Sequence, residues 1–156
     1  MQYEIERKFL VSDKRIIDEL EGKFYKQAYI ETTDKTVVRV RITPDNAFLT
    51  IKGENKGLKR LEYEYVIPKK DANEIIDNLC QKSVIEKIRY VVYHDNKKWE
   101  IDQFLEQNEG LIIAEIELEN ENTEFTKPEW LGMEVTNDVR YFNSNLIKNP
   151  FINWNN

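Results

Sequence analysis

The segment Tyr3-Glu4-Ile5-Glu6-Arg7-Lys8-Phe9, near the start of the chain, alternates in character with a period of two. Successive side chains of a β-strand point to opposite faces of its sheet, so Glu4, Glu6 and Lys8 share one face. The other face carries Tyr3, Ile5, Arg7 and Phe9. The segment therefore predicts a strand with one fully ionic face and one largely apolar face.

The same alternation recurs along the chain. It predicts eight strands, at 2–10, 24–31, 36–43, 47–53, 58–67, 84–94, 97–104 and 111–119. Short turn signals separate several of them, such as Thr33-Asp34-Lys35 and Pro44-Asp45-Asn46. Eight strands joined mostly by short turns favour an antiparallel sheet that closes on itself. We therefore expect an α+β fold built on an eight-stranded antiparallel β-barrel.

Three helices interrupt the strands. The first is predicted at 13–22, and the second, at 71–82, has a clear apolar stripe. The third begins near Val139 and should stop at Asn149-Pro150. Because the helical stripes need an apolar partner, we expect helices to pack on the outside of the barrel, which leaves the ionic faces of the strands inside.

The amino-acid composition and net charge exclude several classes of function. The 156 residues include 23 Lys and Arg against 29 Asp and Glu, a net charge of −6, and they predict a single domain over 1–156 that does not bind nucleic acid. The single cysteine, Cys80, and the single histidine, His94, exclude a zinc finger and an internal disulfide. No apolar run is long enough to span a membrane and no secretory signal is present, so we expect a cytoplasmic protein.

The ionic faces are segregated by charge. Arg39, Arg41 and Lys52 form one basic block and Lys87 and Arg89 form another, whereas the face with Glu115, Glu117 and Glu119 is purely acidic. A solvated sheet face is the simpler interpretation, but such a face usually mixes the two signs. Guanidinium groups suit phosphate oxygens, and clustered carboxylates suit a hard divalent cation. A phosphate chain with Mg²⁺ or Mn²⁺ in the barrel would satisfy both sets, and a solvated sheet stays open as the alternative.

Glu4-Ile5-Glu6-Arg7-Lys8 resembles the ExExK motif of the CYTH superfamily, the triphosphate tunnel metalloenzymes. The resemblance extends over about 1–150 in the expected order. Further segments that resemble small bacterial members are Gln27-Ala28-Tyr29-Ile30, Val38-Arg39-Val40-Arg41, Thr50-Ile51-Lys52-Gly53, Arg60-Leu61-Glu62-Tyr63-Glu64, Glu86-Lys87-Ile88-Arg89-Tyr90, Trp99-Glu100-Ile101-Asp102-Gln103-Phe104, Ala114-Glu115-Ile116-Glu117-Leu118 and Arg140-Tyr141-Phe142-Asn143-Ser144-Asn145-Leu146.

The resemblance implies a tunnel with a charged interior, closed at one end by a plug helix from Val139 onward. It implies a hydrolase, a tripolyphosphatase that splits inorganic triphosphate into pyrophosphate and phosphate with Mg²⁺ or Mn²⁺. The implied metal ligands are Glu4, Glu6, Glu115 and Glu117, with Asp102 as a further candidate. The implied phosphate-binding residues are Lys8, Arg39, Arg41, Lys52, Lys87 and Arg89. The implied catalytic residues are Lys8 with Tyr29, and Glu62 with Glu64 for a second metal or the attacking water.

Three other functions stay open. An adenylate cyclase of the class IV type would share the metal and phosphate groups but needs a nucleobase pocket, for which the sequence gives no candidate. A thiamine or nucleoside triphosphatase would differ only in its substrate. A non-catalytic polyphosphate-binding module would gain nothing from the glutamates. A homodimer is compatible with the sequence, which indicates no interface for it.

Overall fold

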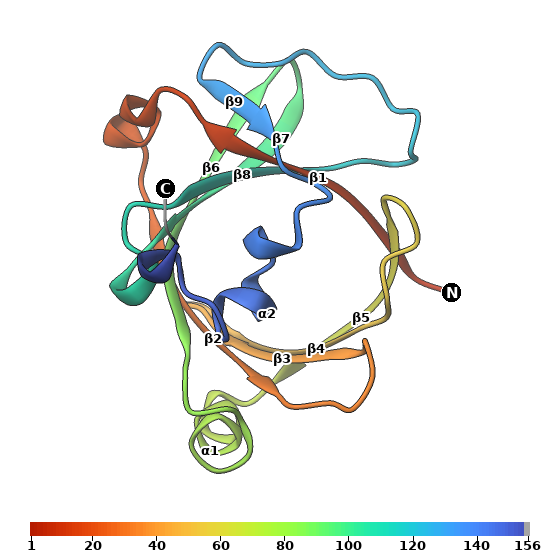
Figure 1. The fold of residues 1–156 in the computed structure, drawn as a ribbon, viewed down its shortest axis with the longest axis vertical. Helices are drawn as coiled ribbons and strands as arrows, with labels where there is room; N and C mark the ends of the chain where they lie inside the picture. The colour runs from red at the N-terminus through yellow and green to blue at the C-terminus, as the bar shows by residue number, and fades with distance from the viewer. Residues whose placement is uncertain (155–156) are drawn as a thin grey trace.

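The computed structural model describes residues 1–154 and shows a ring of strands around a central bore (Figure 1). The strands are β1 (Tyr3–Val11), β2 (Lys23–Ile30), β3 (Val37–Ile42), β4 (Ala47–Lys52), β5 (Lys59–Ile67), β6 (Ile85–His94), β7 (Lys97–Phe104), β8 (Ile112–Glu117) and β9 (Leu131–Glu134). Their order is β5-β4-β3-β2-β6-β7-β8-β1-β9, and a β5–β1 pairing closes the ring. The predicted eight-stranded antiparallel barrel is therefore confirmed.

β9 is an extra strand that the alternation pattern does not predict. It pairs with the last residues of β1, where Phe9 faces Glu134 and Val11 faces Leu131. Gly132 allows this close approach, since a Cβ there would lie 3.0 Å from the carbonyl oxygen of Leu10. The four-residue sequence Leu131-Gly132-Met133-Glu134 is too short to show a period, so the strand depends on tertiary pairing rather than on a local pattern.

The helices lie mainly outside the barrel, as predicted. Helix α1 (Lys69–Leu79) buries Ala72 and Ile76 in a core cluster with residues of β2, β3 and β4, such as Val40. The first predicted helix is a 3-10 helix, η1 (Lys14–Glu19), and is shorter than expected. It begins after Asp13, and none of its residues is fully buried, although Ile16 and Ile17 pack against the apolar core on the outside of the barrel.

The C-terminal segment enters the bore (Figure 1). The helix expected from Val139 is divided into a 3-10 turn, η3 (Val139–Tyr141), and the short helix α2 (Asn143–Leu146). Phe142 separates them because its backbone is extended, with φ −70° and ψ 131°. A last 3-10 turn, η4, covers Phe151–Asn153.

Apolar contacts hold this plug in place. Tyr141 and Leu146 are buried in one cluster with Tyr29, Phe104 and Ile113 of the barrel. At this end of the bore, the ionic side chains of the inner face therefore give way to apolar ones.

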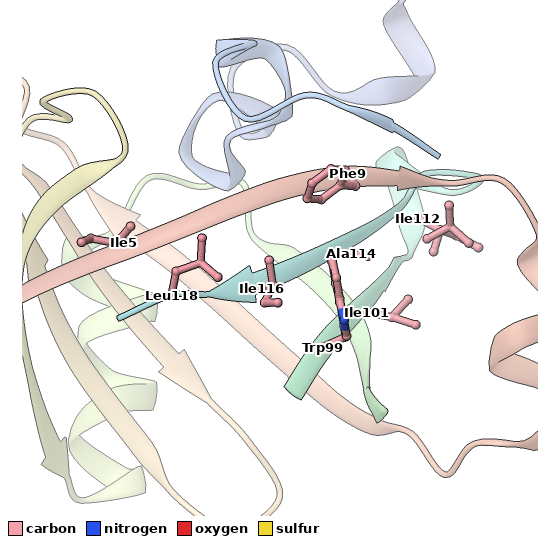
Figure 2. Packing of buried hydrophobic residues seen from close by; sticks show 9 residues of the cluster. Ile5, Phe9, Trp99, Ile101, Ile112, Ala114, Ile116 and Leu118 are labelled. Atoms are coloured by element: carbon pink, nitrogen blue, oxygen red, sulfur yellow. The ribbon is translucent and has the colours of Figure 1, made fainter. Parts of the chain in front are cut away.

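A larger apolar core covers the outer face of β1, β7 and β8. Figure 2 shows Phe9, Trp99 and Ile116 among the packed residues. The fully buried Trp99 ring meets the Phe125 and Trp130 rings edge to face, each at 5.6 Å between centroids. Much of the apolar core thus lies outside the ring, which leaves the charged faces of the strands for the bore. No helix in residues 1–154 is long and apolar enough to cross a membrane.

Candidate active site in the barrel bore

A cavity of about 880 Å³ occupies the bore. Every side chain that the sequence singled out for the site lines this cavity, with the exception of Asp102. The lining set is Glu4, Glu6, Lys8, Tyr29, Arg39, Arg41, Lys52, Glu62, Glu64, Lys87, Arg89, Glu115 and Glu117. The alternation in the sequence therefore brings residues from seven strands to one cavity inside the barrel, and the solvated sheet face considered as the alternative is wrong.

Arg39 and Arg41 of β3 and Arg89 of β6, the two strands that flank β2, form a strongly basic region. Arg39 donates to Thr50 Oγ1 and to Glu64 Oε2, both at 3.3 Å, whereas Arg41 approaches Glu64 only to 3.7 Å. Burial, and then the neighbouring charges of Arg39 and Arg89, lower the pKa of Arg41 to about 10. Positive charge thus exceeds the nearby negative charge, which favours binding of an anion.

Lys87 and Arg89 of β6 share one buried carboxylate, that of Asp102 on β7. Asp102 Oδ2 accepts from Lys87 Nζ and from Arg89 Nη2, each at 2.8 Å, and Oδ1 accepts from Arg89 Nε at 2.7 Å. Burial by itself would raise the pKa of Asp102, but Arg89 and Lys87 hold it well below its usual range. Both oxygens of Asp102 are therefore engaged by the two cations, and its assignment as a metal ligand stays a prediction.

The acidic side of the bore is built by β1 and β8. Their register places Glu6 opposite Glu117 and Lys8 opposite Glu115. Burial raises the pKa of Glu6, with a further contribution from Glu4, and burial followed by the charge of Glu6 raises the pKa of Glu115 and Glu117. These carboxylates repel one another, so a cation among them would be stabilised.

The oxygen donors of this cluster fit a hard divalent cation. Within residues 1–154, no group of three or more carboxylate, imidazole or thiolate side chains has the arrangement of a formed metal site. Two of the carboxylates contact lysines instead: Glu4 Oε2 accepts from Lys52 Nζ at 3.0 Å, and Glu115 lies 3.5 Å from Lys8 Nζ. The chemistry of the donors and the raised pKa values support the predicted ligand set.

Tyr29 and Lys8, which were predicted to act as a pair, both line the cavity. The Tyr29 hydroxyl accepts from Gln27 Nε2 at 2.7 Å, and Lys8 Nζ lies 5.1 Å from the ring centroid of Phe142 in the plug. Glu64 also accepts from Thr50 Oγ1 at 2.8 Å. The catalytic roles of Tyr29, Lys8 and Glu64 stay predictions.

Sequence reasoning missed several polar residues of the site. Gln27 and Thr50 lie on the same strand faces as Tyr29 and Lys52, so the period of two could have identified them. Asn143 comes from the plug, and its Oδ1 accepts from Lys87 Nζ at 2.9 Å and from Gln27 Nε2 at 3.1 Å. No sequence pattern marks Asn143.

Arg60 also lines the cavity. The sequence left open whether its side chain meets substrate or pairs with a carboxylate of the bore. In the structure, Arg60 Nε donates to the backbone carbonyl of Gly53 at 2.6 Å.

Comparisons with known proteins agree with this geometry. The family model of the CYTH domain matches residues 2–149. A protein of Acetivibrio thermocellus named inorganic triphosphatase is 52% identical over 154 residues, which is 99% of each chain. A protein of Nitrosomonas europaea with the same name is 36% identical over 147 residues, which is 92% of this chain and 95% of that protein. A crystal structure of an inorganic triphosphatase superposes with a TM-score of 0.64 at 32% identity, covering 92% of this chain and 96% of that one.

Proposed function

This chain belongs to the CYTH domain family, and from that membership we propose that it hydrolyses inorganic triphosphate to pyrophosphate and phosphate with a divalent metal ion. The observation that carries the proposal is the division of one cavity inside the barrel into a basic side and an acidic side. Its two named relatives, at 52% and 36% identity, are inorganic triphosphatases, which supports the same substrate.

The basic side would bind the phosphate chain. Arg39, Arg41 and Arg89 present guanidinium groups that match phosphate oxygens, and Lys8, Lys52 and Lys87 add ammonium donors. Because Asp102 and Asn143 occupy two of the Lys87 donors, its ammonium keeps a third for substrate. Hydrolysis transfers a phosphoryl group to water, a step in which positioning and neutralisation of charge provide most of the catalysis.

The acidic side would hold the metal. We assign Glu4, Glu6, Glu115 and Glu117 as its ligands and Mg²⁺ or Mn²⁺ as the ion. When bound, such an ion acts as a Lewis acid on phosphate oxygens. Glu62 and Glu64 lie on β5 and face the cavity, where one of them can accept a proton from the attacking water. The water oxygen bonds to a terminal phosphorus while the bridging P–O bond breaks and pyrophosphate leaves.

The test is release of phosphate from triphosphate, ATP and thiamine triphosphate, each with Mg²⁺ and with Mn²⁺. We expect triphosphate to be the preferred substrate and activity to disappear when the metal is chelated. Formation of cyclic AMP from ATP would instead identify a cyclase. No phosphate release from any of the three compounds, by protein that binds triphosphate, would overturn the hydrolase and leave a binding module.

A pair of variants tests the metal assignment. Glu4→Gln removes one charge from the acidic side and should lower kcat about 100-fold or more. Glu129→Gln is the matched control, since Glu129 is exposed and lies outside the cavity lining. Full activity of Glu4→Gln at limiting metal would remove Glu4 from the ligand set.

A further inference from the structure

Tyr25 occupies a position that neither the motif nor the proposed mechanism uses. It lies on β2, on the same face as Gln27 and Tyr29, and its register partner on β6 is Lys87. The strand β2 runs between β3 and β6, which carry arginines of the basic side. The half-buried ring of Tyr25 therefore stands between the phosphate-binding residues of two different strands.

The ring contacts a guanidinium group from each neighbouring strand. Arg41 Cζ lies 5.2 Å from the Tyr25 ring centroid, and Arg89 Cζ lies 5.0 Å from it. Phe48, the register partner of Arg41 on β4, also contacts Arg41, at 5.7 Å. All three distances are within the range of a cation–π interaction. Tyr25 thus contacts both cations, and Arg41 lies between two aromatic rings.

Arg41 has fewer polar partners than Arg89, so the rings contribute more to holding its side chain in place. Its Nε is buried without a hydrogen-bond partner in residues 1–154, and its nearest carboxylate oxygen, on Glu64, is 3.7 Å away. Arg89, in contrast, donates to both Asp102 and Glu100. Arg41 also lies close enough to Arg39 and Arg89 for their positive charges to repel it. Besides the Glu64 carboxylate, the two aromatic rings are therefore the groups that oppose this repulsion.

We propose that Tyr25 is a positioning residue, whose ring holds Arg41 and Arg89 together at the bore so that their N–H groups can meet the phosphate chain. The proposal rests on the proposed triphosphate site and adds to it a residue with no charge. A guanidinium group stacked on a ring keeps its in-plane N–H donors available. The rings thus hold Arg41 without occupying the donors that the substrate needs.

The expected effect falls on substrate binding. Arg41 and Arg89 would contact the phosphate chain both before and during the reaction, so displacing them should raise KM and leave kcat within about twofold. Loss of a desolvated cation–π contact corresponds to about a 5- to 30-fold change in an equilibrium constant. We expect Tyr25→Leu to raise KM for triphosphate by this factor.

Three matched variants make the test specific. Tyr25→Phe keeps the ring and both of its guanidinium contacts, so its KM should equal that of the unaltered protein. Tyr65→Leu makes the same replacement at an exposed tyrosine outside the cavity lining and should leave KM unchanged. Phe48→Leu removes only one ring from Arg41 and should raise KM by a smaller factor. It also serves as the second probe if Tyr25→Leu folds poorly.

Two further measurements separate positioning from a general loss of structure. Metal-free binding of triphosphate, followed by calorimetry, should weaken in Tyr25→Leu by the same factor as KM rises. In an Arg41→Gln background, Tyr25→Leu should raise KM by a clearly smaller factor, because one of the two cations that the Tyr25 ring contacts is gone. Equal KM values for Tyr25→Leu and the unaltered active enzyme would overturn the inference, as would full additivity with Arg41→Gln. An unaltered protein that hydrolyses no triphosphate would instead overturn the proposed function.

Discussion

Replacement of Asp102 by Asn should destabilise the protein strongly. The carboxylate of Asp102 is 2% exposed and accepts three hydrogen bonds from Lys87 and Arg89, whose side chains are also buried. The amide keeps the shape but leaves the Arg89 guanidinium, and the Lys87 amine whose pKa burial already lowers to about 7, without their shared counter-charge. Removal of one partner from a buried pair costs about 3–5 kcal/mol. For a chain of this size, that corresponds to a fall in Tm of roughly 6–20 °C.

Thermal and urea unfolding at neutral pH measure this change. Asp45→Asn is the matched control, because Asp45 pairs with Lys23 on the surface, where an ion pair contributes less than about 1 kcal/mol. Folding lowers the pKa of Asp102, so its contribution is complete above the usual value of 3.8 and is lost as pH falls through the folded-state pKa. The difference between the two proteins should therefore shrink in acid. A loss below about 1 kcal/mol at neutral pH would refute the reasoning.

Three more predictions concern the acidic cluster, the plug and the outer core. Folding raises the pKa of Glu6 above 4.5, so the stability of the metal-free protein should fall as the pH rises through this raised pKa. Mg²⁺ or Mn²⁺ should restore the lost stability. Glu6→Gln should weaken both effects in a series of melting curves. Asn143→Ala removes an acceptor from Lys87 and should cost about 1 kcal/mol in urea unfolding, with a higher KM for triphosphate. Trp99→Ala should cost about 3–5 kcal/mol, and a loss below 1 kcal/mol would contradict the packing seen around Phe125.

The barrel was predictable from sequence because a strand with one charged and one apolar face has a clear period of two. In β1, the positions of Glu4, Glu6 and Lys8 required no tertiary information. The interruption at Phe142 was not predictable, since the surrounding apolar residues fit a helix. Tyr141 and Leu146 pack against barrel strands from distant parts of the chain, and this packing outweighs the local preference.

The members of the site were easier to predict than their partners. A strand face identifies Lys87 and Arg89 as inward-pointing, but the pattern does not say which acid each one meets. The carboxylate of Asp102 could serve as a metal ligand. Only the register of β6 against β7, which puts Arg89 opposite Asp102, shows that it lies between cations. The period of two gives the orientation of a side chain and leaves its neighbours undetermined.

The position of β1 has a consequence for the order in which the protein can assemble. β1 pairs with β5, β8 and β9, all of which follow it in the chain, so its ladder stays incomplete until residues as far as Glu134 have been made. Contacts so distant along the chain are slow to form. During synthesis, the glutamates of the motif, which pair with β5 and β8, therefore cannot form their side of the cavity until residues as far as Glu117 have been made.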